Sequence, residues 1–197
     1  MENWKNPIDG SPGRFPMCVG AIFVGDCPCG CFSPDTKLLT YFPNGDVGWT
    51  SASTIAKNIG DFKLWSLQSH STLSNLISRA SNISSFTEGN EEKPLVIIET
   101  ENGGRLTLTL NHAVLISTGE VLTARELTKS TKLIDISGNH VNISAIYRIK
   151  KREKVYNFMT TGESKIEHLV AAGGVIVGDL SWQNQFEDEI NAIAIRK

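Results

Sequence analysis

Short runs of apolar and β-branched residues, separated by turn residues, dominate the chain from residue 36 onward. The run 105–110 alternates strictly, so its three leucines share one face and Thr109 projects from the other. Turn sequences at 43–46 (Pro-Asn-Gly-Asp) and 102–104 (Asn-Gly-Gly) indicate hairpins. We therefore predict a mainly β domain. The expected strands are 36–42, 95–100, 105–110, 131–136, 141–149, 155–159, 166–171 and 175–177.

Only a few short helices are expected. Residues 53–59 have a serine at the N-cap position and a glycine beyond the end, and 123–129 begin with Thr123 followed by Glu126, a capping-box pattern. A C-terminal helix is predicted after Ser181, since apolar residues recur there at helical spacing through Ile193. The polar stretch 69–92, rich in serine and asparagine, interrupts the β pattern and predicts an inserted loop.

Composition narrows the classes of function. The chain has 197 residues and a formal net charge of -2, so it presents no extended basic field and nucleic acid is not an expected partner. No apolar stretch approaches the ~20 residues of a membrane-spanning helix, so no membrane span is predicted. Residues 1–30 are rich in Gly, Pro and Cys with little periodicity, which predicts a separate leader segment ending near Cys31.

Three of the four cysteines, Cys27, Cys29 and Cys31, lie within five consecutive residues. With Cys18 they could form a zinc-stabilised binding module, although no paired Cys-x-x-Cys or His-x-x-x-His follows to close a four-ligand shell. A disulfide among them is a further alternative in an oxidising compartment. Our leading prediction includes no metal and no cofactor.

Several short motifs occur in a particular order. Gly30-Cys31-Phe32 precedes the first strand, Thr109-Leu110-Asn111-His112 follows an alternating strand, and 155–158 (Val-Tyr-Asn-Phe), His168 and 173–177 (Gly-Gly-Val-Ile-Val) come last. In this order the chain resembles the Hint (hedgehog/intein) superfamily of autoprocessing domains, and hedgehog-type domains in particular. The resemblance implies a compact, horseshoe-like β fold with pseudo-two-fold halves. It divides the chain into a leader at 1–30, a Hint domain at 31–179 and a helical tail at 180–197.

The resemblance also implies a chemistry, with Cys31, Thr109, His112 and His168 as catalytic residues and Gly30–Cys31 as the scissile bond. The Cys31 thiol would attack the Gly30 carbonyl, giving a thioester. Thr109 would hold the strained peptide through its hydroxyl, and His112, with an ordinary pKa near 6.5, would protonate the departing nitrogen at neutral pH. The substrate would be the chain's own N-terminal segment, cleaved once per molecule.

The closing residues differ from those of inteins, which end in His-Asn followed by Cys, Ser or Thr. Here Gly178, Asp179 and Leu180 stand at these positions. Asp179 has no side-chain amide to cyclise and Leu180 has no nucleophile, so we predict N-terminal cleavage without splicing. In hedgehog precursors a sterol-recognition region normally follows the core, whereas only a short helix is expected after Asp179 in this sequence. Water, a small thiol or an amine is therefore the expected acceptor. The alternative is a degenerate Hint domain that keeps the architecture but no longer cleaves.

Overall fold

Strands dominate the computed structural model, which describes residues 30–196 of the chain. The strands are β1 (Lys37–Tyr41), β2 (Val47–Ser51), β3 (Lys63–Leu67), β4 (Ser78–Glu91), β5 (Leu95–Thr100), β6 (Arg105–Thr109), β7 (Ala113–Leu115), β8 (Val121–Thr123), β9 (Lys132–Ile134), β10 (His140–Ile149), β11 (Glu153–Thr160), β12 (Leu169–Ala172) and β13 (Val175–Gly178). The predicted mainly β class is confirmed, and the prediction for 95–100 matches β5 at both ends.

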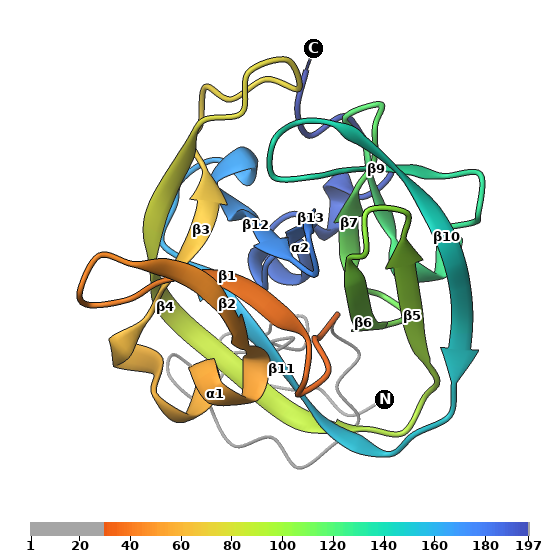
Figure 1. Cartoon of the computed structure of the whole chain (residues 1–197), viewed down its shortest axis with the longest axis horizontal. Helices are drawn as coiled ribbons and strands as arrows, with labels where there is room; N and C mark the ends of the chain where they lie inside the picture. Colours follow the sequence, from red (N-terminus) through yellow and green to blue (C-terminus); the bar gives the residue numbers. More distant parts are fainter. Residues whose placement is uncertain (1–29, 197) are drawn as a thin grey trace, which may run out of the picture.

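The strands form two curled sheets (Figure 1). One has nine strands in the order β11-β4-β3-β1-β12-β13-β7-β8, with β2 added beside β1. The other has the order β6-β5-β10-β9. The two long strands β4 and β11 pair antiparallel over most of their length. In Figure 1 they run together from the left of the view to its lower right. Residues far apart in sequence meet at Phe32, which forms isolated β-bridges to Leu108 of β6 and to Tyr156 of β11.

The helices are shorter than predicted. α1 (Ala52–Lys57) begins at an N-cap Ser51 whose side chain accepts a hydrogen bond from the backbone of Thr54, and η1 (Ile59–Asp61) follows it. The prediction of a helix at 123–129 is wrong. The capping box between Thr123 and Glu126 forms, but it closes only the 3-10 turn η2 (Ala124–Glu126), because Leu127 returns to an extended backbone. A further 3-10 turn, η3 (Lys165–His168), takes the first half of the strand predicted at 166–171.

The predicted loop at 69–92 is also wrong over most of its length. Residues 78–91 form β4, the longest strand, which pairs with β3 along one part and with β11 along the other. Its polar side chains are mostly half-buried or exposed. Backbone pairing with two neighbours outweighs the low intrinsic strand preference of serine and asparagine, because β propensity depends strongly on tertiary context.

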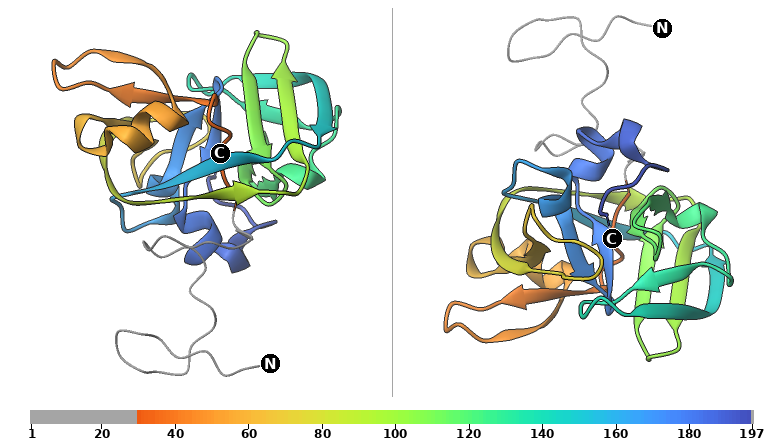
Figure 2. Two further views of the ribbon diagram at one scale, coloured as in Figure 1. Left: turned by 90° about the horizontal axis from the view of Figure 1, so that it is seen from below. Right: turned by 90° about the horizontal axis from the view of Figure 1, so that it is seen from above.

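The C-terminal segment is part of the core. α2 (Ser181–Asn184) is a single turn and η4 (Glu187–Glu189) follows it, so the predicted longer helix after Ser181 is wrong in length. Trp182 and Ile195 are fully buried and belong to the same apolar cluster as Leu115 and Ile176. In both views of Figure 2 this dark blue segment lies along one side of the strands. The segment thus helps to close the hydrophobic core.

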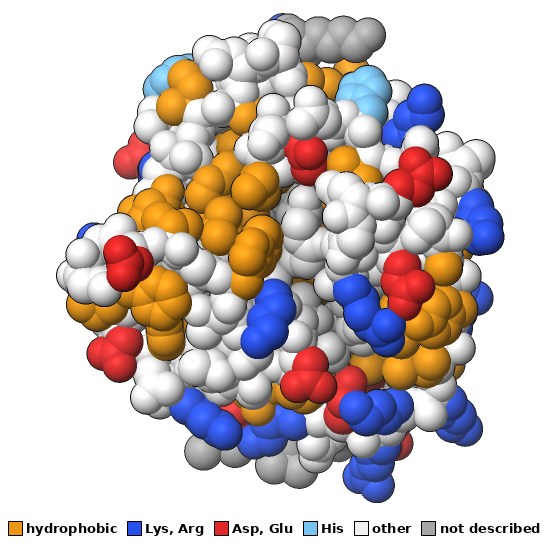
Figure 3. All heavy atoms as spheres, viewed as in Figure 1, with side chains coloured by type: hydrophobic (Ala, Val, Ile, Leu, Met, Phe, Trp, Pro, Cys, Tyr) orange, Lys and Arg blue, Asp and Glu red, His pale blue; other side chains and the backbone are white. Residues whose placement is uncertain are grey.

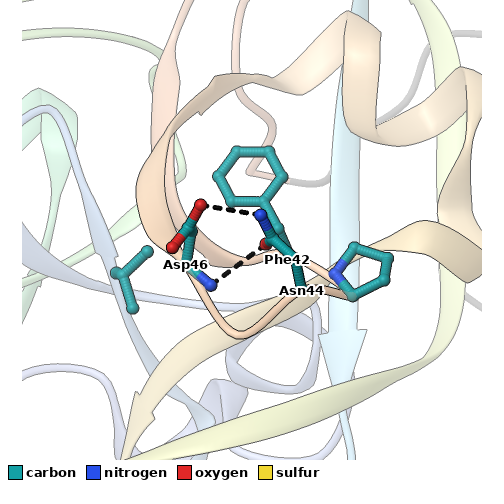
Figure 4. A pocket seen from close by; sticks show the side chains of 5 residues that line it. Phe42, Asn44 and Asp46 are labelled. Atoms are coloured by element: carbon teal, nitrogen blue, oxygen red, sulfur yellow. Dashed lines mark hydrogen bonds between the residues drawn. The ribbon is translucent and has the colours of Figure 1, made fainter.

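The tip of the β1–β2 hairpin forms a small open hollow (Figure 4). The side chain of Asn44 donates to Asp46, and Gly45 takes a φ of 88°, a left-handed conformation that favours glycine. The lining residues run from Phe42 through the turn to Val47, the first residue of β2, so the hollow follows from the hairpin tip itself.

Charges of both signs are interspersed on the face in Figure 3. Ion pairs at the surface join Lys154 to Glu88 and Arg105 to Glu99. Within residues 30–196, no helix has the length and apolar character needed to cross a membrane.

Candidate active site

The segment that follows Gly30 is fixed between the two sheets. The backbone of Phe32 exchanges hydrogen bonds with Tyr156 of β11, at 2.7 and 3.0 Å, and Ser33 N donates to Thr107 O of β6 at 3.1 Å. The Phe32 side chain is fully buried in the core. The Gly30–Cys31 peptide is therefore anchored on its C-terminal side by strands from both halves of the fold.

Thr109 holds the nitrogen of this peptide. Cys31 N donates to Thr109 Oγ1 at 2.7 Å, and the Thr109 backbone N–H donates in return to Cys31 O at 3.0 Å. Thr109 ends β6 on the face opposite the buried leucines, as the alternation predicts, and is itself buried. The hydroxyl therefore contacts the nitrogen that would leave in a cleavage reaction.

Asn157 holds the carbonyl of the same peptide. Its Nδ2 donates to Gly30 O at 2.5 Å, and its Oδ1 accepts from the backbone of Phe158 at 2.8 Å. The side chain is fully buried in β11. A side-chain amide aimed at a carbonyl oxygen inside a dry site can stabilise negative charge that develops on that oxygen.

Gly30 fits where no other residue would. A Cβ on Gly30 would lie 2.4 Å from His112 Cα, 2.8 Å from His112 N and 2.5 Å from Gln183 Nε2. Two of these atoms belong to backbone, which cannot turn aside. The absence of a side chain at residue 30 is what allows the peptide to lie against His112.

The imidazole of His112 is completely buried. It packs against Phe32, with ring centroids 4.3 Å apart. Burial lowers the pKa of His112 from 6.5 to about 3, although the carbonyls of Gly178 and Gly30 oppose this shift. Within residues 30–196, neither ring nitrogen reaches good hydrogen-bond geometry with a partner. Burial therefore favours the neutral ring at neutral pH. A role for His112 in proton transfer stays a prediction.

The side chain of Cys31 is 1% exposed. It lies in a small apolar cluster with Leu95, Val155 and the half-buried Ile149, where β5, β10 and β11 meet. The thiol is thus shielded from bulk water at the start of any reaction.

The overall arrangement matches solved structures of inteins. A DnaB intein from Synechocystis aligns with 20% identity and a TM-score of 0.57, covering 76% of this chain and 98% of that one. An intein from a hyperthermophile aligns with 16% identity and a TM-score of 0.62, covering 76% and 99%. The TvoVMA intein aligns with 15% identity and a TM-score of 0.57, covering 75% and 96%. The chain has the Hint fold. The predicted fold is thus confirmed, while a closer kinship with hedgehog-type domains stays a prediction.

At the level of sequence, no protein-family model matches the chain, and no curated protein matches it. The likeness to inteins therefore rests on architecture.

His168 lies elsewhere in the Hint fold, in a buried network with Asp179. Its Nδ1 is 2.9 Å from Asp179 Oδ2, and Thr160 donates to the same carboxylate through both its N–H and its hydroxyl, each at 2.7 Å. Burial works to lower the pKa of His168, but the hydrogen bond and charge of Asp179 outweigh it and raise the pKa. Within residues 30–196 the His168 ring contacts Asp179, Thr160 and the backbone of Gly162, so the structure does not bring it to the Gly30–Cys31 peptide.

Metal binding by the cysteine run falls outside the described part of the chain. Cys18, Cys27 and Cys29 precede residue 30, where the description begins. From residue 30 to residue 196, no group of three or more His, Cys, Asp and Glu side chains could hold a metal ion.

The structure thus brings Cys31, Thr109 and His112 to one peptide bond, and adds Asn157, which the sequence analysis did not single out. One signal could have identified Asn157. It is an amide in the middle of an otherwise apolar run, 155–158, whose residues are all buried. A buried polar side chain needs partners, so such a position deserves scrutiny in any sequence.

Proposed function

We propose that the chain is an autoprocessing domain that cleaves its own Gly30–Cys31 bond once, through a thioester, without splicing. The observation that carries this proposal is the set of contacts on one peptide. Thr109 contacts its nitrogen, Asn157 contacts its carbonyl oxygen, and the backbone of His112 lies against Gly30. Any buried peptide needs partners for its N–H and its C=O. Here both partners are side chains, and the next residue supplies a nucleophile.

The neutral state of His112 determines the order of proton transfers. The imidazole takes the thiol proton while the Cys31 sulfur forms a bond to the Gly30 carbonyl carbon, and Asn157 Nδ2 stabilises the resulting oxyanion. The carbon–nitrogen bond then breaks and its electron pair stays on the nitrogen. The imidazolium returns the proton to that nitrogen, and the same burial that lowers the pKa of His112 makes it a strong acid at this step.

The products are a thioester between Gly30 and the Cys31 side chain and a free amine on Cys31. Water attacks the thioester carbonyl, the carbon–sulfur bond breaks, and the Cys31 thiolate that leaves takes up a proton from the attacking water. A small thiol or an amine would resolve the thioester by the same route. The N-terminal segment leaves with a carboxylate, or joined to the acceptor, on Gly30.

Two features support a reaction that ends at this step. The carboxylate of Asp179 is engaged by His168, by Thr160 and by the backbone of Ser181 at 2.7 Å. Residues beyond Leu180 also supply Trp182 and Ile195 to the core. Release of that segment would expose both side chains to water, at a cost of several kcal/mol.

Intact mass spectrometry of the full chain tests this function. We expect a fragment that ends at Gly30 to accumulate, faster with dithiothreitol, and to end in a hydroxamate when hydroxylamine is present. Cys31→Ala should abolish cleavage, whereas the exposed substitution Lys129→Ala should leave it unchanged. A wild-type chain that stays intact under all these conditions would contradict the proposal and identify a degenerate Hint domain.

A further inference from the structure

The side-chain amide of Asn157 donates both of its protons and accepts a hydrogen bond at its oxygen. Oδ1 accepts from Phe158 N at 2.8 Å, which fixes which end of the amide carries the nitrogen. Nδ2 then has two protons, one for Gly30 O at 2.5 Å and one for Gln183 Oε1 at 2.6 Å. The orientation of the group that contacts the scissile carbonyl therefore depends on a residue outside β11.

That residue, Gln183, belongs to the C-terminal segment. It lies on α2, is 6% exposed, and places its Nε2 2.5 Å from the point that a Cβ on Gly30 would occupy. Within residues 30–196, Nε2 has no hydrogen-bond partner. A buried amide with an unsatisfied N–H is an expensive way to fill space, so packing alone does not explain a glutamine here.

We propose that Gln183 is a positioning residue, which holds the Asn157 amide on the Gly30 carbonyl oxygen while charge develops there. This inference rests on the proposed autoprocessing function. Without the Gln183 oxygen, one Nδ2 proton of Asn157 has no acceptor in a dry site, and the amide gains by rotating away from Gly30. Gln183 thus links the C-terminal segment to the reacting peptide.

The test compares first-order cleavage rates of full-length chains in dithiothreitol. The variants are Gln183→Leu, Asn157→Ala, the double variant, and the control Gln185→Leu at an exposed position of the same segment. We expect Asn157→Ala to slow cleavage about 10²-fold, as loss of an oxyanion donor does. Gln183→Leu should slow it about tenfold through misplacement of that donor. Gln185→Leu should match the wild type.

The double variant separates positioning from general support of the fold. Since Gln183 acts through Asn157, its loss should cost nothing further in the Asn157→Ala chain. Independent, multiplicative losses would overturn the inference, as would a Gln183→Leu chain that cleaves as fast as wild type. Gln183→Met, whose thioether is only a weak hydrogen-bond acceptor, replaces Gln183→Leu if circular dichroism shows that the leucine variant is unfolded. If the wild-type chain never cleaves, both the proposed function and this inference are overturned. If the wild type cleaves and the Gln183 variants cleave equally fast, only the inference is overturned.

Discussion

Substitution of Gly30 by alanine should slow cleavage severely by displacing the scissile peptide. The new methyl group would lie 2.4 Å from His112 Cα, whereas ordinary contact begins at 3.4 Å. The peptide must therefore move by about 1 Å, and a displacement of that size in a reacting group costs about 10²-fold in rate. The move also lengthens the hydrogen bonds from Asn157 to Gly30 O and from Cys31 N to Thr109, so 10²-fold is a lower bound.

The assay is a time course of purified chain in dithiothreitol, quenched in acid and quantified by mass spectrometry. Gly60→Ala is the matched control, because no atom lies within 4 Å of a Cβ at that residue and its φ is not left-handed. This control should cleave at the wild-type rate. If Gly30→Ala did so too, the peptide would have room that the structure denies it, and the placement of His112 against Gly30 would be refuted.

Three further predictions concern stability, measured by urea unfolding of chains made uncleavable by Cys31→Ala. Thr109→Val leaves the buried N–H of residue 31 without its acceptor and should cost about 1–3 kcal/mol. Stability that depends on neutral His112 is complete above pH 6.5 and is lost as pH falls toward its folded pKa of about 3. About 3 kcal/mol should therefore disappear between pH 7 and pH 4, but not in a His112→Leu chain. Trp182→Ala should cost about 3–5 kcal/mol, because the indole is fully buried.

For each of these three stability predictions, one result would contradict the reasoning. A Thr109→Val chain as stable as its parent would mean that the N–H of residue 31 finds another acceptor. Equal acid sensitivity with and without the histidine would place His112 in contact with water. A small effect of Trp182→Ala would show that the C-terminal segment is dispensable for folding.

Sequence periodicity predicted a strand well where apolar and polar residues alternate along it or where most of its residues are apolar. The alternating run that became β6 and the apolar β5 illustrate this. It failed at β4, whose serine-rich sequence has no strand pattern and is held by neighbours on both sides. The predicted helix at 123–129 was too long for a different reason. A capping box indicates where a helix begins but not whether it continues. Pairing with neighbouring strands decided the structure of β4.

The candidate site was predictable in part, because Cys31, Thr109 and His112 stand in a recognisable order. The neutral state of His112 was not, since it depends on burial that only the folded chain creates. Gln183 gives no signal in the sequence at all. Its partner Asn157 is distant along the chain, and only the return of α2 beneath β11 brings the two together.

The anchoring of Phe32 by both β11 and β6 has a consequence for reversibility. When the bond before Cys31 breaks, this anchor keeps the newly formed chain end where it was. The severed piece, while it lingers, faces that end at a very high effective concentration, so religation competes with escape. Diffusion of the piece into solution removes this advantage, so departure of the fragment, more than bond breaking itself, makes the reaction one-way.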